Sequence, residues 1–102
     1  MSEDSRVTHV EWWLEWSSEP GRMLWARLRQ FADGRADILD CDGVTHSFAN
    51  YDEAANWLLE DEYSRWKNMV ESGEVPAGTT TPVAADEEEL KQLLIASARG
   101  EV

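Results

Sequence analysis

Two Asp-Gly dipeptides constrain the fold of this chain more than any other feature. Asp33-Gly34 and Asp42-Gly43 each stand between runs of strand-forming residues. Such a pair favours a tight β-hairpin, because a two-residue type I′ turn needs a positive φ angle at both of its positions. The flanking runs cover residues 22–31, 35–41 and 44–48. The sequence therefore predicts three antiparallel strands joined by two-residue turns.

A further strand precedes these hairpins. Residues 7–16 alternate between two sets of side chains with a period of two, which is typical of a strand. A five-residue loop at 17–21, rich in Ser, Pro and Gly, places Trp12 opposite Ala26 in the predicted register. One sheet face then carries the side chains that we expect to form the core, namely Val10, Trp12, Leu14, Leu24, Ala26, Leu28, Leu39, Cys41, Val44 and Phe48.

The hydrophobic period changes after the last strand. Asn50 and Glu53 form an N-terminal capping box, and an apolar stripe follows at helical spacing. The stripe predicts one helix that runs to about residue 70 and ends near Gly73. The predicted fold class is therefore α+β, a four-stranded antiparallel meander with one long helix packed on one face.

The C-terminal part of the chain has a different composition. Residues 72–85 are rich in Pro, Gly and Thr without periodicity, which predicts a flexible linker. The linker joins a β-meander plus helix domain at 1–71 to an acidic amphipathic helix at 86–100. The sequence leaves open whether Leu90 and Leu94 of that helix dock on the chain's own sheet or on a partner.

The charge of the chain restricts its partners. Twenty-one Asp and Glu residues against nine Lys and Arg residues give a net charge of −12. Duplex DNA and anionic membranes are polyanions, so neither is an expected partner. A single Cys permits no intramolecular disulfide, and no apolar run approaches the ~20 residues of a transmembrane helix. Without a signal peptide at the start, the chain is expected to be cytoplasmic.

The second sheet face holds the predicted partner-binding residues. In the predicted register Trp13 lies opposite Trp25 on a face that the long helix does not cover, and Arg27 lies between Glu11 and Asp40. Exposed large apolar groups mark interaction sites, although a Trp pair also stabilises a sheet or packs beneath a helix. The predicted binding residues are Trp13, Trp25, Trp57, Arg27, Arg29, Glu60 and Asp61.

Three functional hypotheses follow from these residues. The first is a non-enzymatic adaptor or inhibitor that binds a basic patch on another protein, with Trp anchors and with Glu60, Asp61 and Glu87 to Glu89 as steering charges. The second is a ligand or single-stranded nucleic-acid binder that uses the exposed Trp platform. The third is an enzyme that uses Glu62 and His46. The first hypothesis fits the acidic charge best.

Metal binding and catalysis have weak signals in this sequence. His9, His46 and Cys41 are the only soft ligands, too few for a zinc signature. The run from Asp40 to Gly43 resembles a calcium loop, but its Gly has the wrong offset for an EF-hand, so we interpret it as a hairpin tip. We expect no metal, no cofactor and no catalytic residue, and a Cys41 thiol that only packs.

Overall fold

The computed structural model describes residues 6–17, 22–73 and 80–99. Five strands form one antiparallel sheet in the order β4-β3-β2-β1-β5. This confirms the α+β class and the meander of four strands, and it adds a fifth strand. The elements are β1 (Val7–Ser17), β2 (Arg22–Phe31), β3 (Ala36–Leu39), β4 (Thr45–Phe48), α1 (Tyr51–Glu60), β5 (Ser64–Arg65), α2 (Trp66–Ser72) and α3 (Glu87–Arg99).

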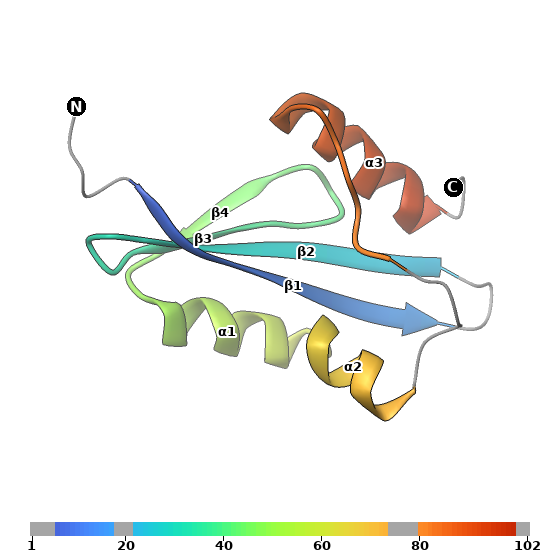
Figure 1. The fold of residues 1–102 in the computed structure, drawn as a ribbon, viewed down its shortest axis with the longest axis horizontal. Coiled ribbons are helices and arrows are strands. Elements are labelled where there is room, and N and C mark those ends of the chain that lie inside the picture. The colour runs from blue at the N-terminus through green and yellow to red at the C-terminus, as the bar shows by residue number, and fades with distance from the viewer. Residues whose placement is uncertain (1–5, 18–21, 74–79, 100–102) are drawn as a thin grey trace.

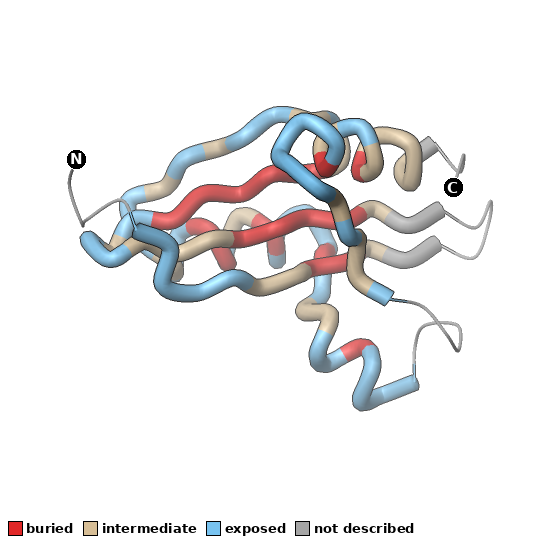
Figure 2. Tube along the Cα trace, turned by 45° about the horizontal axis from the view of Figure 1, so that its top comes forward, coloured by how far each residue is buried: buried red, intermediate tan, exposed pale blue. Residues whose placement is uncertain are grey.

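The sheet lies between helices. Figure 1 shows α1 against one face and α3 against the opposite face, so the molecule has three layers over its central strands. Burial is concentrated in the middle of β1 and β2 and along the whole of β3, as the red segments in Figure 2 show. Both faces of the sheet therefore contribute to the core.

Both Asp-Gly hairpins differ from their predicted geometry. Gly34 and Gly43 have φ angles of 94° and 81°, but neither preceding Asp has a positive φ. The backbone N–H of Phe31 donates to the carbonyl of Arg35 at 2.8 Å, which leaves a three-residue loop. A type I turn followed by a left-handed Gly gives this longer loop, and its Asp needs no unusual conformation. The predicted two-residue turns are therefore wrong.

The extra loop residue in each Asp-Gly hairpin shifts the pairing of its two strands by one position. Arg27 lies opposite Leu39 instead of Asp40. The pairing of β1 with β2 is also one position away from the predicted register. Ser17 pairs with Arg22, so four residues separate the two strands instead of the predicted five. A shift of one residue moves a side chain to the other face.

The predicted single core face is consequently divided between two clusters. The cluster against α1 contains Trp13, Ala26, Leu28, Ala36, Ile38, Ala54, Ala55, Leu58 and Tyr63. The cluster against α3 contains Leu14, Trp25, Leu39, Met69, Leu90 and Leu94. Two residues expected in the core, Val10 and Val44, are about half exposed, at 48% and 50%.

The predicted long helix is two helices. The cap is confirmed, because the Asn50 side chain accepts the Glu53 N–H at 2.9 Å, and so is the end, where Gly73 adopts a φ of 73°. Between them the chain leaves the helix after Glu60 and forms β5. If the helix continued past Glu60, the burial of Tyr63 and the backbone pairing of β5 with β1 would both be lost.

The helix α3 docks on the chain's own sheet. Leu94 has no exposed surface and Leu90 is 7% exposed, and both pack in the cluster that contains Trp25 and Leu39. This answers the question that the sequence left open. The predicted linker includes residues 74–79, which lie outside the described residues, and the proposed domain division stays a prediction.

The close approach of Gly43 to α3 provides a test of the hairpin geometry. A Cβ atom at Gly43 would lie 2.9 Å from Cδ1 of Ile95, whereas one at Gly34 meets nothing within 4 Å. Both positions have a positive φ, which costs an L-residue about 1–2 kcal/mol. Gly43→Ala is therefore expected to lower the free energy of unfolding more than Gly34→Ala, as measured by urea denaturation. Equal losses would show that the hairpin does not touch α3.

Leu94 tests whether α3 belongs to the core. Leu94→Ala removes a fully buried side chain and is expected to destabilise the protein by about 2–5 kcal/mol. Val83→Ala is the control, since Val83 is 86% exposed and its truncation should change stability little. A Leu94→Ala variant as stable as the control would show that α3 is not part of the folded unit in solution.

Candidate functional site

Carboxylates gather where α1 ends. Glu60, Asp61 and Glu62 follow one another there, and all three are exposed. Glu15 of β1 belongs to the same group, since its pKa is raised by partial burial and then by the negative charges of Glu62 and Asp61. We call Glu15, Glu60, Asp61 and Glu62 the acidic patch.

The position of the acidic patch is electrostatically unfavourable for the fold. The C-terminal end of a helix carries partial negative charge and favours cations, yet α1 has no basic residue in its last turn. Within the described part of the chain, no cation forms an ion pair with any member of the patch. Leu59, beside these carboxylates, is 51% exposed. Among the described residues, the patch is thus a negative surface without ion-pair partners, next to an exposed apolar side chain.

The backbone at Glu62 is also unusual. Glu62 has a φ of 67°, and it is the one non-glycine residue with a positive φ among the described residues. Glycine or asparagine would adopt this conformation more easily. Helical spacing from the Asn50 cap would place Glu62 within the apolar stripe of the predicted long helix, and this expectation is wrong because the helix ends at Glu60.

The predicted pair of exposed tryptophans does not exist. Trp13 lies opposite Ala26 on the α1 face with 0% exposure, and Trp25 lies on the α3 face with 2% exposure. The one-residue register shift separates them. The Trp13 indole donates to Glu11 at 2.9 Å, and Trp25 packs against Trp66 at a centroid distance of 5.2 Å. Both indoles are therefore part of the hydrophobic core and not of an exposed surface.

Trp57 is half-buried instead of pointing freely outward. Its ring packs against His46 and Phe48 of β4, with centroid distances of 4.9 and 5.7 Å. The Trp57 ring therefore fills the space between α1 and the edge strand β4.

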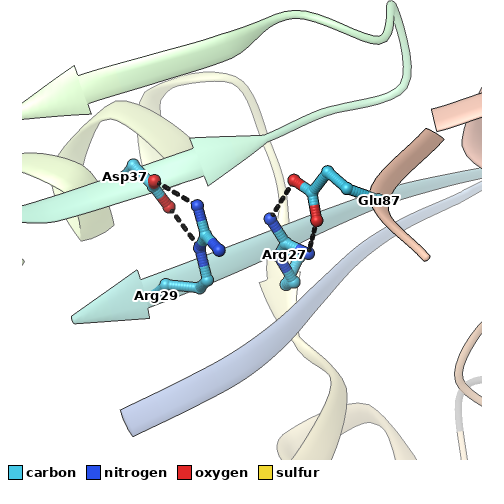
Figure 3. Close-up of polar contacts among 4 residues, drawn as sticks. All are labelled: Arg27, Arg29, Asp37 and Glu87. Atoms are coloured by element: carbon cyan, nitrogen blue, oxygen red, sulfur yellow. Dashed lines mark hydrogen bonds and ion pairs between the residues drawn. The ribbon is translucent and has the colours of Figure 1, made fainter. Parts of the chain in front are cut away.

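The two arginines of the predicted site are neutralised inside the chain. Arg27 donates from both terminal nitrogens to the two carboxylate oxygens of Glu87, each at 2.7 Å (Figure 3). Arg29 forms a second two-point pair with Asp37, at 3.0 and 2.7 Å. The Arg27 side chain is only 10% exposed. The expectation that Glu11 and Asp40 flank Arg27 is wrong, and Glu87, distant in sequence, takes their place.

A groove lies beside the Arg27–Glu87 pair. It encloses about 420 Å³ between the sheet and the segment that leads into α3. Its lining consists of Trp12, Arg27, Pro82, Val83, Ala84, Asp86, Glu87 and Leu90. The lining of the groove thus includes the Arg27–Glu87 pair and Leu90, through which α3 packs on the sheet.

The tip of the β3–β4 hairpin brings together three potential metal ligands. Asp40, Asp42 and His46 each offer a donor atom, and these atoms all lie within 4.8 Å of one another. Burial, followed by the neighbouring Asp42 carboxyl, raises the pKa of Asp40 to about 6. The sequence indicates Asp40 and Asp42 as part of a calcium-like run and His46 as a separate soft ligand, but it does not reveal that the β3–β4 pairing brings His46 close to the two carboxylates.

The residues suggested for catalysis are not combined into a site. No described contact joins Glu62 to His46. The Cys41 sulfur lies 3.7 Å from the Tyr63 hydroxyl, and burial raises the pKa of this thiol. A raised pKa leaves little reactive thiolate at neutral pH.

No protein-family model, no curated protein and no solved structure matches this chain. Among the helices that the structure describes, none is both long and apolar enough to cross a bilayer. The class that the structure defines is a small α+β sandwich with one antiparallel sheet between helical layers.

The Arg27–Glu87 pair makes stability depend on pH. The pKa of Glu87 is lowered from 4.5, chiefly by its hydrogen bonds to Arg27, so the folded state favours the charged carboxylate. The pair therefore stabilises the fold above about pH 4.5, and this contribution is lost as the pH falls further. We expect Glu87→Gln to be less stable than the wild type at pH 7, with the difference shrinking on acidification in thermal melts. Glu88→Gln is the control; if it behaves like Glu87→Gln, the effect is general charge and not the pair.

Proposed function

We propose that this chain is a small, acidic, non-enzymatic interaction module of the cytoplasm. In this proposal it binds a partner protein through a segment of that partner that carries Lys and Arg. The contact surface is the acidic patch together with exposed Leu59. Glu60 and Asp61 act as the steering charges.

The proposal depends mainly on one observation, that these carboxylates stand where their charge destabilises the fold. Three of them stand at the negative end of a helix whose last turn has no basic residue, they form no ion pair with any described cation, and Glu62 occupies a left-handed position as well. Side chains selected for stability alone would be Lys or Arg at this helix end and Gly at position 62. A trade of stability for an interaction surface accounts for acidic residues there.

Leu59 adds the second element of a protein interface. Interfaces combine apolar contact with a charged rim, and opposite charges accelerate the encounter of the two partners. An exposed leucine that directly precedes three exposed acidic residues fits a basic segment that also carries apolar side chains.

The alternative function, a binder of ligands or single strands on an aromatic platform, lacks supporting geometry. Trp13 and Trp25 are buried on opposite faces, and Arg27 and Arg29 are paired with carboxylates of the same chain. Stacking of bases on the α3 face would require displacement of α3 and exposure of Leu94.

A charge-neutralisation experiment tests the proposal. The double variant Glu60→Gln/Asp61→Asn should associate about tenfold more slowly with a short Lys- and Arg-rich peptide at low salt, and the difference should shrink as salt rises. Stopped-flow fluorescence measures the rate. The melting temperature of the same variant should be equal to or above that of the wild type, since two charges at the unfavourable helix end are removed.

The matched control removes the same charge elsewhere. Glu71→Gln/Glu88→Gln neutralises two exposed carboxylates outside the acidic patch. If this control slows association as much as the patch variant does, net charge and not the patch is responsible, and the proposal is wrong. A fall in the melting temperature of the patch variant would instead assign its carboxylates a structural role.

A further inference from the structure

The hairpin tip between β3 and β4 has polar atoms that the fold itself leaves unsatisfied. Nε2 of His46 is shielded from solvent and has no hydrogen-bond partner within the described residues. It points to Oδ2 of Asp40 across 3.5 Å, and Asp40 itself is only 9% exposed. A shielded polar atom without a partner in the chain is costly, so Nε2 of His46 is available to bind a group from outside the chain.

The distance between these two atoms is compatible with two ligands of one metal ion. A separation of 3.5 Å with no hydrogen bond is long for an N–H···O contact. Two ligands bound to one tetrahedral ion at about 2.1 Å lie about 3.4 Å apart. The Asp40–His46 separation therefore matches the edge of a coordination shell.

A third ligand and an oriented shell complete the arrangement. Asp42 offers a donor atom within 4.8 Å of the other two. Hydrogen bonds from the backbone fix both carboxylates, because Oδ1 of Asp40 accepts from the Asp42 N–H at 3.2 Å and Oδ1 of Asp42 accepts from the Val44 N–H at 2.9 Å. The His46 ring is held against Trp57. Such supports orient the ligands of protein metal sites.

We propose that Asp40, Asp42 and His46 form a binding site for a divalent first-row transition metal ion, of which Zn²⁺ is the best fit. One imidazole nitrogen and two carboxylate oxygens suit zinc, whereas Ca²⁺ and Mg²⁺ prefer oxygen ligands alone. Asp42 is exposed, so water completes the coordination on the outer side. The site is independent of the acidic patch and does not rest on the proposed function.

The bound ion has a structural consequence in this proposal. Asp40 and Asp42 lie in the loop between β3 and β4, and His46 lies in the edge strand β4. An ion that joins them closes the hairpin next to Gly43, whose Cα side faces Ile95 of α3. Metal binding therefore stabilises the edge of the sheet and the hairpin tip on which α3 rests.

Titration of the full chain with zinc chloride alone tests the site. Calorimetry at pH 7 should give one Zn²⁺ per chain, and Co²⁺ should give visible absorption bands typical of a site with nitrogen and oxygen ligands. His46→Gln and Asp42→Asn should each weaken Zn²⁺ binding by more than about tenfold. Asp42→Asn keeps the proposal testable if His46→Gln fails to fold, because Asp42 is exposed and an Asn oxygen still accepts the Val44 N–H.

His9 provides a matched control. Its Nε2 lies 3.5 Å from a Glu11 oxygen, the same separation as in the proposed site, but the His9 side chain is 49% exposed and belongs to no group of three potential ligands in the described chain. His9→Gln should bind Zn²⁺ like the wild type. Absence of binding up to about 1 mM Zn²⁺, retention of full affinity in both site variants, or loss of affinity in His9→Gln would each overturn the proposal. Ca²⁺ that binds as tightly as Zn²⁺ would overturn the assigned metal class.

Discussion

The pairing of β1 with β2 decides how the rest of the molecule is arranged. Because Trp13 lies opposite Ala26 while Leu14 lies opposite Trp25, both faces of these strands present large apolar side chains. A sheet that is apolar on both faces needs a cover on each of them. Here α1, from the middle of the chain, covers one face and α3, from its C-terminal part, covers the other.

A polar network at the outer edge of β1 then determines where the acidic patch lies. Glu11 accepts hydrogen bonds from Trp13 and from the Tyr51 hydroxyl, while the Arg65 guanidinium lies 4.6 Å over the Trp13 ring. These contacts tie the start of α1 and the strand β5 to β1. Only residues 61–63 connect α1 to β5, so the chain turns sharply there, at Glu62. The turn is required by the fold, but the acidic side chains on it are not.

Local signals in the sequence predict the elements of this fold better than their register. The Asn50 cap, the Gly73 helix end and the antiparallel meander follow from short-range chemistry. Asp-Gly, however, serves hairpin loops of two and of three residues, since Gly takes the left-handed position in both. The choice depends on packing against distant elements such as α3, and an error of one residue exchanges the two faces of a strand.

The same dependence explains which site residues the sequence reveals. Glu60 and Asp61 are recognisable because they adjoin each other at a helix end. Glu15 joins them only through the strand arrangement, and the link from Glu87 to Arg27 spans 60 residues. Likewise, His46 meets Asp40 only across a folded hairpin. Contacts made between strands leave no spacing pattern along the chain.

The distribution of charge connects the folding of this protein with both proposals. Arg27, Arg29, Arg35 and Arg65 each form an ion pair with a carboxylate of the same chain, at Glu87, Asp37, Asp33 and Glu11. Each of these four pairs cancels its own charge, so the net charge of −12 comes from carboxylates outside them. Such carboxylates repel one another and favour binding of cations from outside. At the end of α1 they are exposed over an open surface and suit the spread charges of a basic protein segment. At the hairpin tip they converge with an imidazole around one point, which suits a single divalent ion.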